Sequence, residues 1–502
     1  MGSRHAPRRG AAPAAALLVL TQLAACSRLG PEQLLGTQDR LTLGGRPRSI
    51  VLAGGGEAPL VAFVEQEASG DTDVLVLAAS ADAGRSFSAA VPVAAGDDAR
   101  RAAEPVLFVG PDGEATIVWR ALASGRRSLR AVRHAPAGTS ARAPDDAPDQ
   151  AIELAADTTA PPRGGGTIPT VVAGTGAISG SPVHPEVNLE VWQWAPQRRA
   201  WARLPGLAQR ARALGYHVWA GEPAPGRDPL TIMAAIDPSG RLAITALAMG
   251  EAQKSREPPE LPDTSLRPRS TVLDALPAGP EPPWIGAAAG RAVVAWSEQS
   301  GGLEAKARAA VKLTSSADAG VSWSAPLAIM ASETGMPPLA RFATGDGSIA
   351  AVWCQRDERE GAARESGPSR IMLAVSSDGG RSFAGSAAVD SGLPGRLRLS
   401  PDVALAAGRV LIAWQEQALG AGGRPEVHAA LSLDRGRSWA IADTRIDDPG
   451  ALREAWFPAT WLAPDGRGLV AWESRAPRQA VFHSPADVDK RLPASVLARW
   501  LR

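Results

Sequence analysis

"SSDGGRSF", residues 376–383, is a short polar stretch in a chain of 502 residues whose hydrophobic content is 45%. The same skeleton, S-x-D-x-G-x-S-[FW], occurs three more times. The other copies are SADAGRSF at 80–87, SADAGVSW at 316–323 and SLDRGRSW at 432–439. A turn that is built four times in one chain indicates a repeated architecture.

Apolar stretches that end in an aromatic residue form a second periodic signal. They end at Phe63, Trp119, Trp296, Trp353, Trp414 and Trp472. The last four are separated by 57, 61 and 58 residues, and the first two by 56. The remaining gap of 177 residues equals three such units, so two weaker copies are expected inside it.

Prolines mark the start of each unit, about a dozen residues before the aromatic position. They are Pro47, Pro105, Pro169, Pro229, Pro283, Pro338, Pro401 and Pro458. Proline suits the first residue of a strand, where its missing N–H removes no ladder hydrogen bond. Eight starts predict eight units; seven is the alternative, because the third and fourth units are degenerate.

Each unit is predicted to contain four antiparallel strands, which is the blade of a β-propeller. A single blade cannot bury both of its faces, but blades stacked around an axis can. The last unit has candidate third-strand residues at 479–484 and no clear fourth strand. The orphan stretch 39–45 is therefore expected to complete it, which closes the ring and removes exposed strand edges. One propeller over 39–490 and a C-terminal tail over 491–502 follow from this division.

The repeated turns resemble the Asp box of the sialidase or BNR-repeat superfamily. The aspartate can accept hydrogen bonds from backbone N–H groups of its own turn, the glycine can take a positive φ, and the aromatic can pack between blades. The residues concerned are Asp82, Gly84, Phe87, Asp318, Gly320, Trp323, Asp378, Gly380, Phe383, Asp434, Gly436 and Trp439. In that superfamily the boxes lie away from the active site, so the resemblance implies a structural role for them.

The N-terminus has the features of an export signal. Three arginines precede a short apolar stretch that cannot span a bilayer, and Leu-Ala-Ala-Cys follows at 23–26. This order resembles the bacterial lipoprotein box, which implies a signal peptide over 1–25, acylation of Cys26, a tether over 26–38 and anchoring in the outer membrane of the cell envelope. An ordinary secretory signal is the alternative. Lipidation would leave Cys354 without a disulfide partner, and its strand-like surroundings favour a buried, inert thiol.

Composition excludes several classes of function. A formal net charge of +1 argues against a nucleic-acid partner. The six histidines are scattered without metal-ligand spacing, and no phosphate-cradling glycine loop or nucleophile elbow is present. No metal and no cofactor are therefore expected.

The sialidase resemblance implies a late tyrosine nucleophile and three arginines that bind a carboxylate. The single tyrosine, Tyr216, lies in the middle of the chain, and only Arg46, immediately before Pro47, approaches the expected arginine motif. Catalysis of that type is therefore not the favoured prediction.

The loops that join second to third strands should surround one mouth of the ring. Polar residues follow the aromatic positions there and are candidates for a ligand-binding rim, although solvated strand ends are the simpler interpretation. The weak catalytic candidates are Glu65, Glu298 and Glu416, and the rim candidates are Arg46, Arg120, Gln355, Arg356 and Glu473. The favoured function is a non-catalytic binding or scaffold module for a glycan or a partner protein, and a glycoside hydrolase with a non-standard active site is the alternative.

Overall fold

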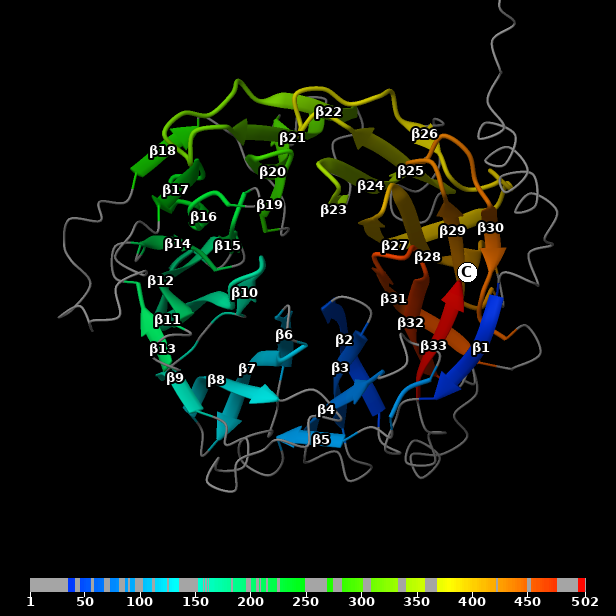
Figure 1. Ribbon diagram of the computed structural model, residues 1–502, viewed down its shortest axis with the longest axis horizontal. Coiled ribbons are helices and arrows are strands. Elements are labelled where there is room, and N and C mark those ends of the chain that lie inside the picture. Colours follow the sequence, from blue (N-terminus) through cyan, green and yellow to red (C-terminus); the bar gives the residue numbers. More distant parts are fainter. Residues whose placement is uncertain are drawn as a thin grey trace, which may run out of the picture.

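The computed structural model is an all-β ring of eight sheets (Figure 1). It describes residues 35–501 with gaps, of which the longer ones are 41–45, 67–72, 95–102, 135–151, 249–268, 274–281, 301–307, 333–339, 357–367 and 476–494. The signal peptide, Cys26, Asp82 and Gly84 lie outside the described residues. Eight blades confirm the larger of the two predicted counts.

In blades 1 to 7 the antiparallel strands follow the sequence order from the centre outward, and in blade 8 the N-terminal β1 takes the outermost position. Blade 1 consists of β2 (Arg46–Gly55), β3 (Ala58–Gln66), β4 (Asp73–Ala79) and β5 (Val91–Ala94), and blade 2 of β6 (Ala103–Val109), β7 (Ala115–Ala123), β8 (Arg126–His134) and β9 (Ile152–Ala156). Blade 3 consists of β10 (Arg163–Gly164), β11 (Thr170–Ser181) and β12 (His184–Ala195), with β13 (Ala200–Arg203) and β14 (Arg210–Arg212) sharing the outer position. Blade 4 consists of β15 (Tyr216–Gly221), β16 (Leu230–Ile236), β17 (Leu242–Ala248) and β18 (Arg269–Leu273).

Blades 5 to 8 continue the ring. Blade 5 consists of β19 (Trp284–Ala288), β20 (Arg291–Ser300), β21 (Arg308–Ser316) and β22 (Leu327–Ser332), and blade 6 of β23 (Ala340–Gly345), β24 (Ser348–Arg356), β25 (Ser369–Ser376) and β26 (Ala387–Ala388). Blade 7 consists of β27 (Arg396–Ala406), β28 (Arg409–Ala418), β29 (Glu426–Ser432) and β30 (Ile441–Arg445). Blade 8 consists of β31 (Glu454–Leu462), β32 (Gly468–Arg475), β33 (Ser495–Leu501) and β1 (Leu35–Arg40). Among the described residues, no helix is long and apolar enough to cross a membrane.

The N-terminal strand closes the ring, as predicted. β1 pairs antiparallel with β33, with Asp39 opposite Ala498 and Arg40 opposite Leu497. The described strand covers 35–40, so it begins inside the predicted tether, and residues 41–45 of the expected strand lie outside the described residues. The expected tail was wrong, because β33 provides the third strand of blade 8. The stretch 479–484, expected in that role, lies outside the described residues.

Blades 3 and 4 differ from the predicted register. Pro169 and Pro229 precede β11 and β16, which are second strands and not first strands. The inner positions are filled instead by β10, which has only two residues, and by β15. The proline pattern identified a strand start in both units, but the short inner strand upstream left no pattern of its own.

The second-strand aromatics lie between blades. Each one is buried and packs in a cluster with residues of the preceding blade: Phe63 with Leu469, Trp119 with Leu60, Trp296 with Ile232, Trp353 with Met330, Trp414 with Val352 and Trp472 with Leu411. Side chains alternate along a strand, so a fixed register directs every one of these rings to the same side of its blade. The core is therefore a circle of blade interfaces.

The repeated turns are held by bonds within each turn. In the turn at 316–323, Asp318 accepts hydrogen bonds from the Ser322 N–H and hydroxyl, and the Gly320 N–H donates to Ser316 Oγ. The bonds from Ser322 lower the pKa of Asp318 to about 2. The turns at 376–383 and 432–439 repeat the same bonds. Their glycines have φ of +81°, +84° and +82°, and Trp323, Phe383 and Trp439 pack against the neighbouring blade.

Candidate functional site

The inner strands of blades 1 to 6 line an open cavity of about 460 Å³ in the centre of the ring. We call it the central cavity. Its walls come from β2, β6 and β10 and from β15, β19, β20 and β23, so residues as far apart as Ser49 and Phe342 share it. The apolar part of the wall includes Ile50, Val51, Leu52, Pro105, Val106, Leu107, Pro162, Pro282, Pro283, Ala295 and Ala340.

Aromatic rings form one side of the central cavity. Trp284 of β19 and Phe342 of β23 are stacked, with ring centroids 5.2 Å apart and an interplanar angle of 26°. Trp296 of β20 also lines this side. Flat aromatic faces in a concave apolar wall are suited to the apolar face of a ring-shaped ligand.

The ionisable groups in the lining are all basic. Arg163 comes from β10 and Arg341 from β23, and His217 comes from β15. No aspartate or glutamate is among the described residues that line the central cavity. Burial, and then the charge of Arg163, lower the pKa of His217 to about 3. The imidazole is therefore neutral at physiological pH.

The glutamates expected at the mouth of the ring do not form an exposed rim. Glu65 is 3% exposed and Glu416 is 1% exposed. Both stand two positions after an aromatic, and so does Glu298. Because side chains alternate along a strand, these carboxylates point with the aromatic toward the preceding blade and not into the ring. Glu298 illustrates this, since it accepts a hydrogen bond from the Trp296 indole at 2.8 Å and pairs with Lys312.

The other rim candidates are also dispersed. Glu473 is buried against Arg475, and burial raises its pKa. Gln355 is exposed, while Arg120 and Arg356 are half-buried on β7 and β24. None of these residues lines the central cavity. Arg46 begins β2, but its side chain lies outside the described part of the structure.

Tyr216 has a structural position. Its side chain is 1% exposed, and its hydroxyl accepts a hydrogen bond from the Gly174 N–H at 3.2 Å. This contact joins blade 4 to blade 3. A buried hydroxyl in a blade interface cannot reach a ligand in the central cavity, which argues against the tyrosine nucleophile that the sialidase resemblance implies.

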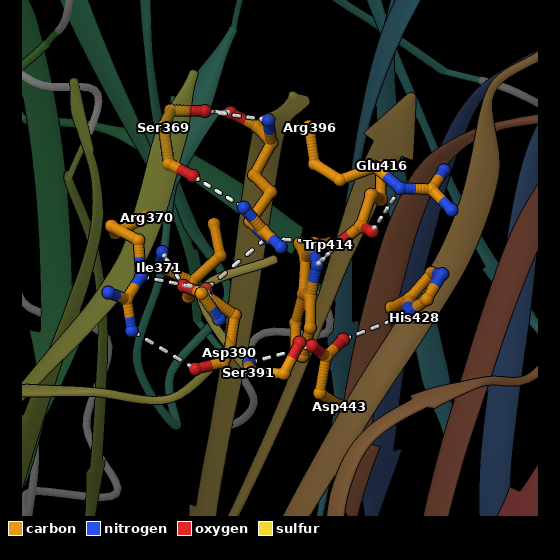
Figure 2. A network of polar contacts seen from close by, with 12 residues as sticks. Ser369, Arg370, Ile371, Asp390, Ser391, Arg396, Trp414, Glu416, His428 and Asp443 are labelled. Atoms are coloured by element: carbon orange, nitrogen blue, oxygen red, sulfur yellow. Dashed lines mark hydrogen bonds and ion pairs between the residues drawn. The ribbon is translucent and has the colours of Figure 1, made fainter. Parts of the chain in front are cut away.

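A dense ionic network lies between blades 6 and 7 (Figure 2). At its centre the fully buried Arg398 of β27 contacts Glu416 Oε2 at 2.9 Å and Asp390 Oδ1 at 3.4 Å, and it donates to the Ser369 carbonyl at 2.7 Å. Nearby, Cys354 donates its thiol proton to the Arg398 carbonyl, and burial raises the pKa of that thiol.

His428 occupies the outer part of the same network. Its Nδ1 lies 2.9 Å from Asp443 Oδ1, and its Nε2 lies 3.5 Å from Glu426 Oε2. Asp443 also accepts the Ser391 N–H at 2.7 Å, which fastens the connection from blade 6. Burial lowers the pKa of His428, but the bonds to Asp443 and Glu426 and the charge of Glu416 outweigh it and raise that pKa to about 9.

The ligand atoms of Glu416, His428 and Asp443 lie within 4.8 Å of one another, which is close enough to share a metal ion. The surrounding charges favour a proton instead. Glu416 already faces two guanidinium groups, those of Arg396 and Arg398. In the directly contacting set, five carboxylates meet four guanidinium groups, so one protonated imidazole balances the charge. The members are Asp390, Glu416, Glu426, Asp443 and Asp447, and Arg370, Arg396, Arg398 and Arg445.

The sequence contained little signal for the central cavity. Arg163, His217, Trp284 and Phe342 belong to inner strands, two of them in the degenerate units. The inner strands have no shared motif, and none of these four residues stands at a repeated position. Only the ring geometry brings them together.

Comparisons with known proteins do not assign this chain to a family. No family model and no curated protein matches the chain. Among solved structures, the NanB sialidase of Streptococcus pneumoniae aligns at 11% identity and a TM-score of 0.37, covering 93% of this chain and 70% of that one. An alpha-L-arabinofuranosidase of Fusarium graminearum aligns at 10% identity and a TM-score of 0.39. A protein of unknown function from Dyadobacter fermentans aligns at 13% identity and a TM-score of 0.39. Each of these two alignments covers 93% of this chain and 98% of the other. At this level of likeness, the activities of those enzymes say nothing about this chain.

Proposed function

We propose that this protein is a lipid-anchored, non-catalytic binding protein of the bacterial envelope, and that its ligand enters the central cavity. The observation that carries the proposal is the lining itself, which is apolar, aromatic and basic and in its described part contains no carboxylate. Most glycosidases need two carboxyl groups about 5–10 Å apart on either side of the scissile bond. The carboxylates that the sequence offered point into blade interfaces.

A glycan is the ligand class that best fits the aromatic wall. The stacked pair of Trp284 and Phe342 presents flat rings next to polar groups that can orient a sugar. The rigid ring of blades holds these side chains in place before the ligand arrives, which lowers the entropic cost of binding.

A glycan array with neutral and acidic sugars tests the proposal. The mature protein is expected to bind a subset of the arrayed glycans without releasing reducing ends. Replacing Phe342 by Ala should reduce binding at least about tenfold, because one face of the aromatic wall is lost. Val321→Ala, which shortens an exposed side chain of a repeated turn, is the matched control and should leave binding unchanged. Turnover of any glycan that Glu298→Gln abolishes while the fold is intact would establish the glycoside hydrolase alternative.

The envelope location rests on the lipoprotein box and is tested separately. Cys26→Ala should abolish incorporation of labelled palmitate and move the protein from the membrane fraction to the soluble fraction, since stable anchoring needs the acyl chains. Cys354→Ala removes the chain's other cysteine and should change neither result. Membrane association that persists in the Cys26 variant contradicts the anchor.

A further inference from the structure

Two polar atoms in the wall of the central cavity are buried without a hydrogen-bond partner. They are Nε of Arg163 and Nδ1 of His217. Buried polar groups are almost always paired, and each exception costs stability. Two such exceptions in the wall of one cavity therefore call for a partner that comes from outside the chain.

The two side chains come from adjacent inner strands that are tied together. Gly166 and Ala220 form a parallel bridge between blades 3 and 4. The Ala220 N–H donates to the Gly165 carbonyl at 3.1 Å, and the Ile168 N–H donates to the Ala220 carbonyl at 3.1 Å. These bonds hold Arg163 and His217 beside each other at fixed positions.

The electrostatics of the wall favour an anion. Arg163 on β10 and Arg341 on β23 are the charged groups of the lining, and β2, β6, β19 and β20 contribute none to it. Arg341 interacts with Asp402 of β27, which leaves the positive charge of Arg163 as the main field at His217. An arriving anion meets a guanidinium and an imidazole, both of which bind oxyanions well.

We propose that Arg163 and His217 form a subsite for the oxyanion group of the ligand, a carboxylate, sulfate or phosphate, while the ring of that ligand lies against Trp284 and Phe342. This inference rests on the proposed binding function and specifies its ligand class, an acidic sugar or another ring-bearing acid. The oxyanion accepts hydrogen bonds from the Arg163 guanidinium and from the imidazole. A negative charge beside the imidazole favours its protonated form, so binding takes up a proton.

Paired probes that differ only in charge test the subsite. Glucuronate is compared with glucose, and benzoate with benzamide, by calorimetric titration of the full-length mature chain. We expect the acid of each pair to bind at least about tenfold more tightly than its neutral partner. We also expect this preference to grow from about pH 8 to about pH 5, because the affinity rises as pH falls wherever the complex holds the extra proton.

Variants separate the two side chains. Arg163→Met and His217→Phe should each reduce the acid preference to less than about threefold. His217→Gln retains a hydrogen-bond donor but cannot titrate, so it should keep part of the preference and lose its pH dependence. Arg381→Met replaces an exposed arginine of a repeated turn and should change nothing. Circular dichroism and thermal unfolding check that each variant is folded.

The outcomes distinguish this inference from the proposed function. If acids and neutral probes bind equally well and Phe342→Ala weakens both, the central cavity binds ligands but the oxyanion subsite does not exist. An acid preference in the parent protein without any pH dependence overturns the role of His217. If no probe binds and array binding is insensitive to Phe342→Ala, the proposed function fails and the subsite fails with it.

Discussion

At the scale of single residues, charge balance decides what each buried group does. His428 is protonated because Asp443 accepts its Nδ1–H and the Glu426 carboxylate lies 3.5 Å from its Nε2. His217 is neutral because burial and the charge of Arg163 act in the same direction. One imidazole therefore completes an internal ionic network, while the other keeps a buried nitrogen without a partner among the described residues.

The network makes stability depend on alkaline pH. The pKa of His428 is raised from 6.5 to about 9 in the folded protein. Its contribution is therefore fully present below about pH 6.5 and is lost as pH rises through about 9, and it is on the order of 3 kcal/mol. Urea unfolding between pH 6 and 10 should show this loss in the parent protein and a flatter profile in His428→Gln. His134→Gln, in blade 2, is the control. Equal slopes in all three proteins would show that His428 is not protonated in the fold.

At the scale of strands, packing between neighbouring blades is the main source of stability. A second-strand aromatic is buried in a cluster that joins its own sheet to the preceding blade. At one interface the ionic network also connects neighbouring blades, because Arg398 of blade 7 contacts Ser369 and Asp390 on the blade 6 side. Buried ion pairs add little net stability but penalise a wrong register.

Removing one second-strand aromatic should loosen the whole ring. Trp119 is completely buried, so Trp119→Ala should lower the free energy of unfolding by about 3–5 kcal/mol, through lost burial and the cavity left behind. Phe457→Ala is the matched control, because Phe457 is 51% exposed, and it should change stability by less than about 0.5 kcal/mol. Chemical denaturation measures both. Similar losses in the two variants would contradict the packing between blades.

At the scale of the whole molecule, closure protects the sheet edges. β1 is supplied by the N-terminal end of the described chain and pairs with β33 at the other end. Without β1, the backbone N–H and C=O groups of β33 would be exposed along one edge, which invites pairing between molecules.

Two truncations test closure. A chain that starts at residue 35 retains β1, and a chain that starts at residue 41 lacks it. We expect the shorter chain to lose at least about 2 kcal/mol of stability, from the missing hydrogen bonds between β1 and β33, and to elute as oligomers in size-exclusion chromatography. A monomeric shorter chain with unchanged stability would mean that β1 does not close the ring.

The sequence by itself determined the ring. Four copies of one turn, six aromatic-ended strands and eight prolines recur at a single period, and these are local signals that need no knowledge of distant contacts. The unpaired strand near the N-terminus was then expected to complete the last blade.

Only the tertiary structure decided where the site lies. Glu65 and Glu416 looked like rim residues by position, but strand register turned them into blade interfaces, because a shift of one residue reverses every side chain. Arg163, His217, Trp284 and Phe342 span about 180 positions of the chain and follow no common pattern. They meet because the inner strands of separate blades face one axis, and that convergence is a property of the closed ring and not of any one stretch of sequence.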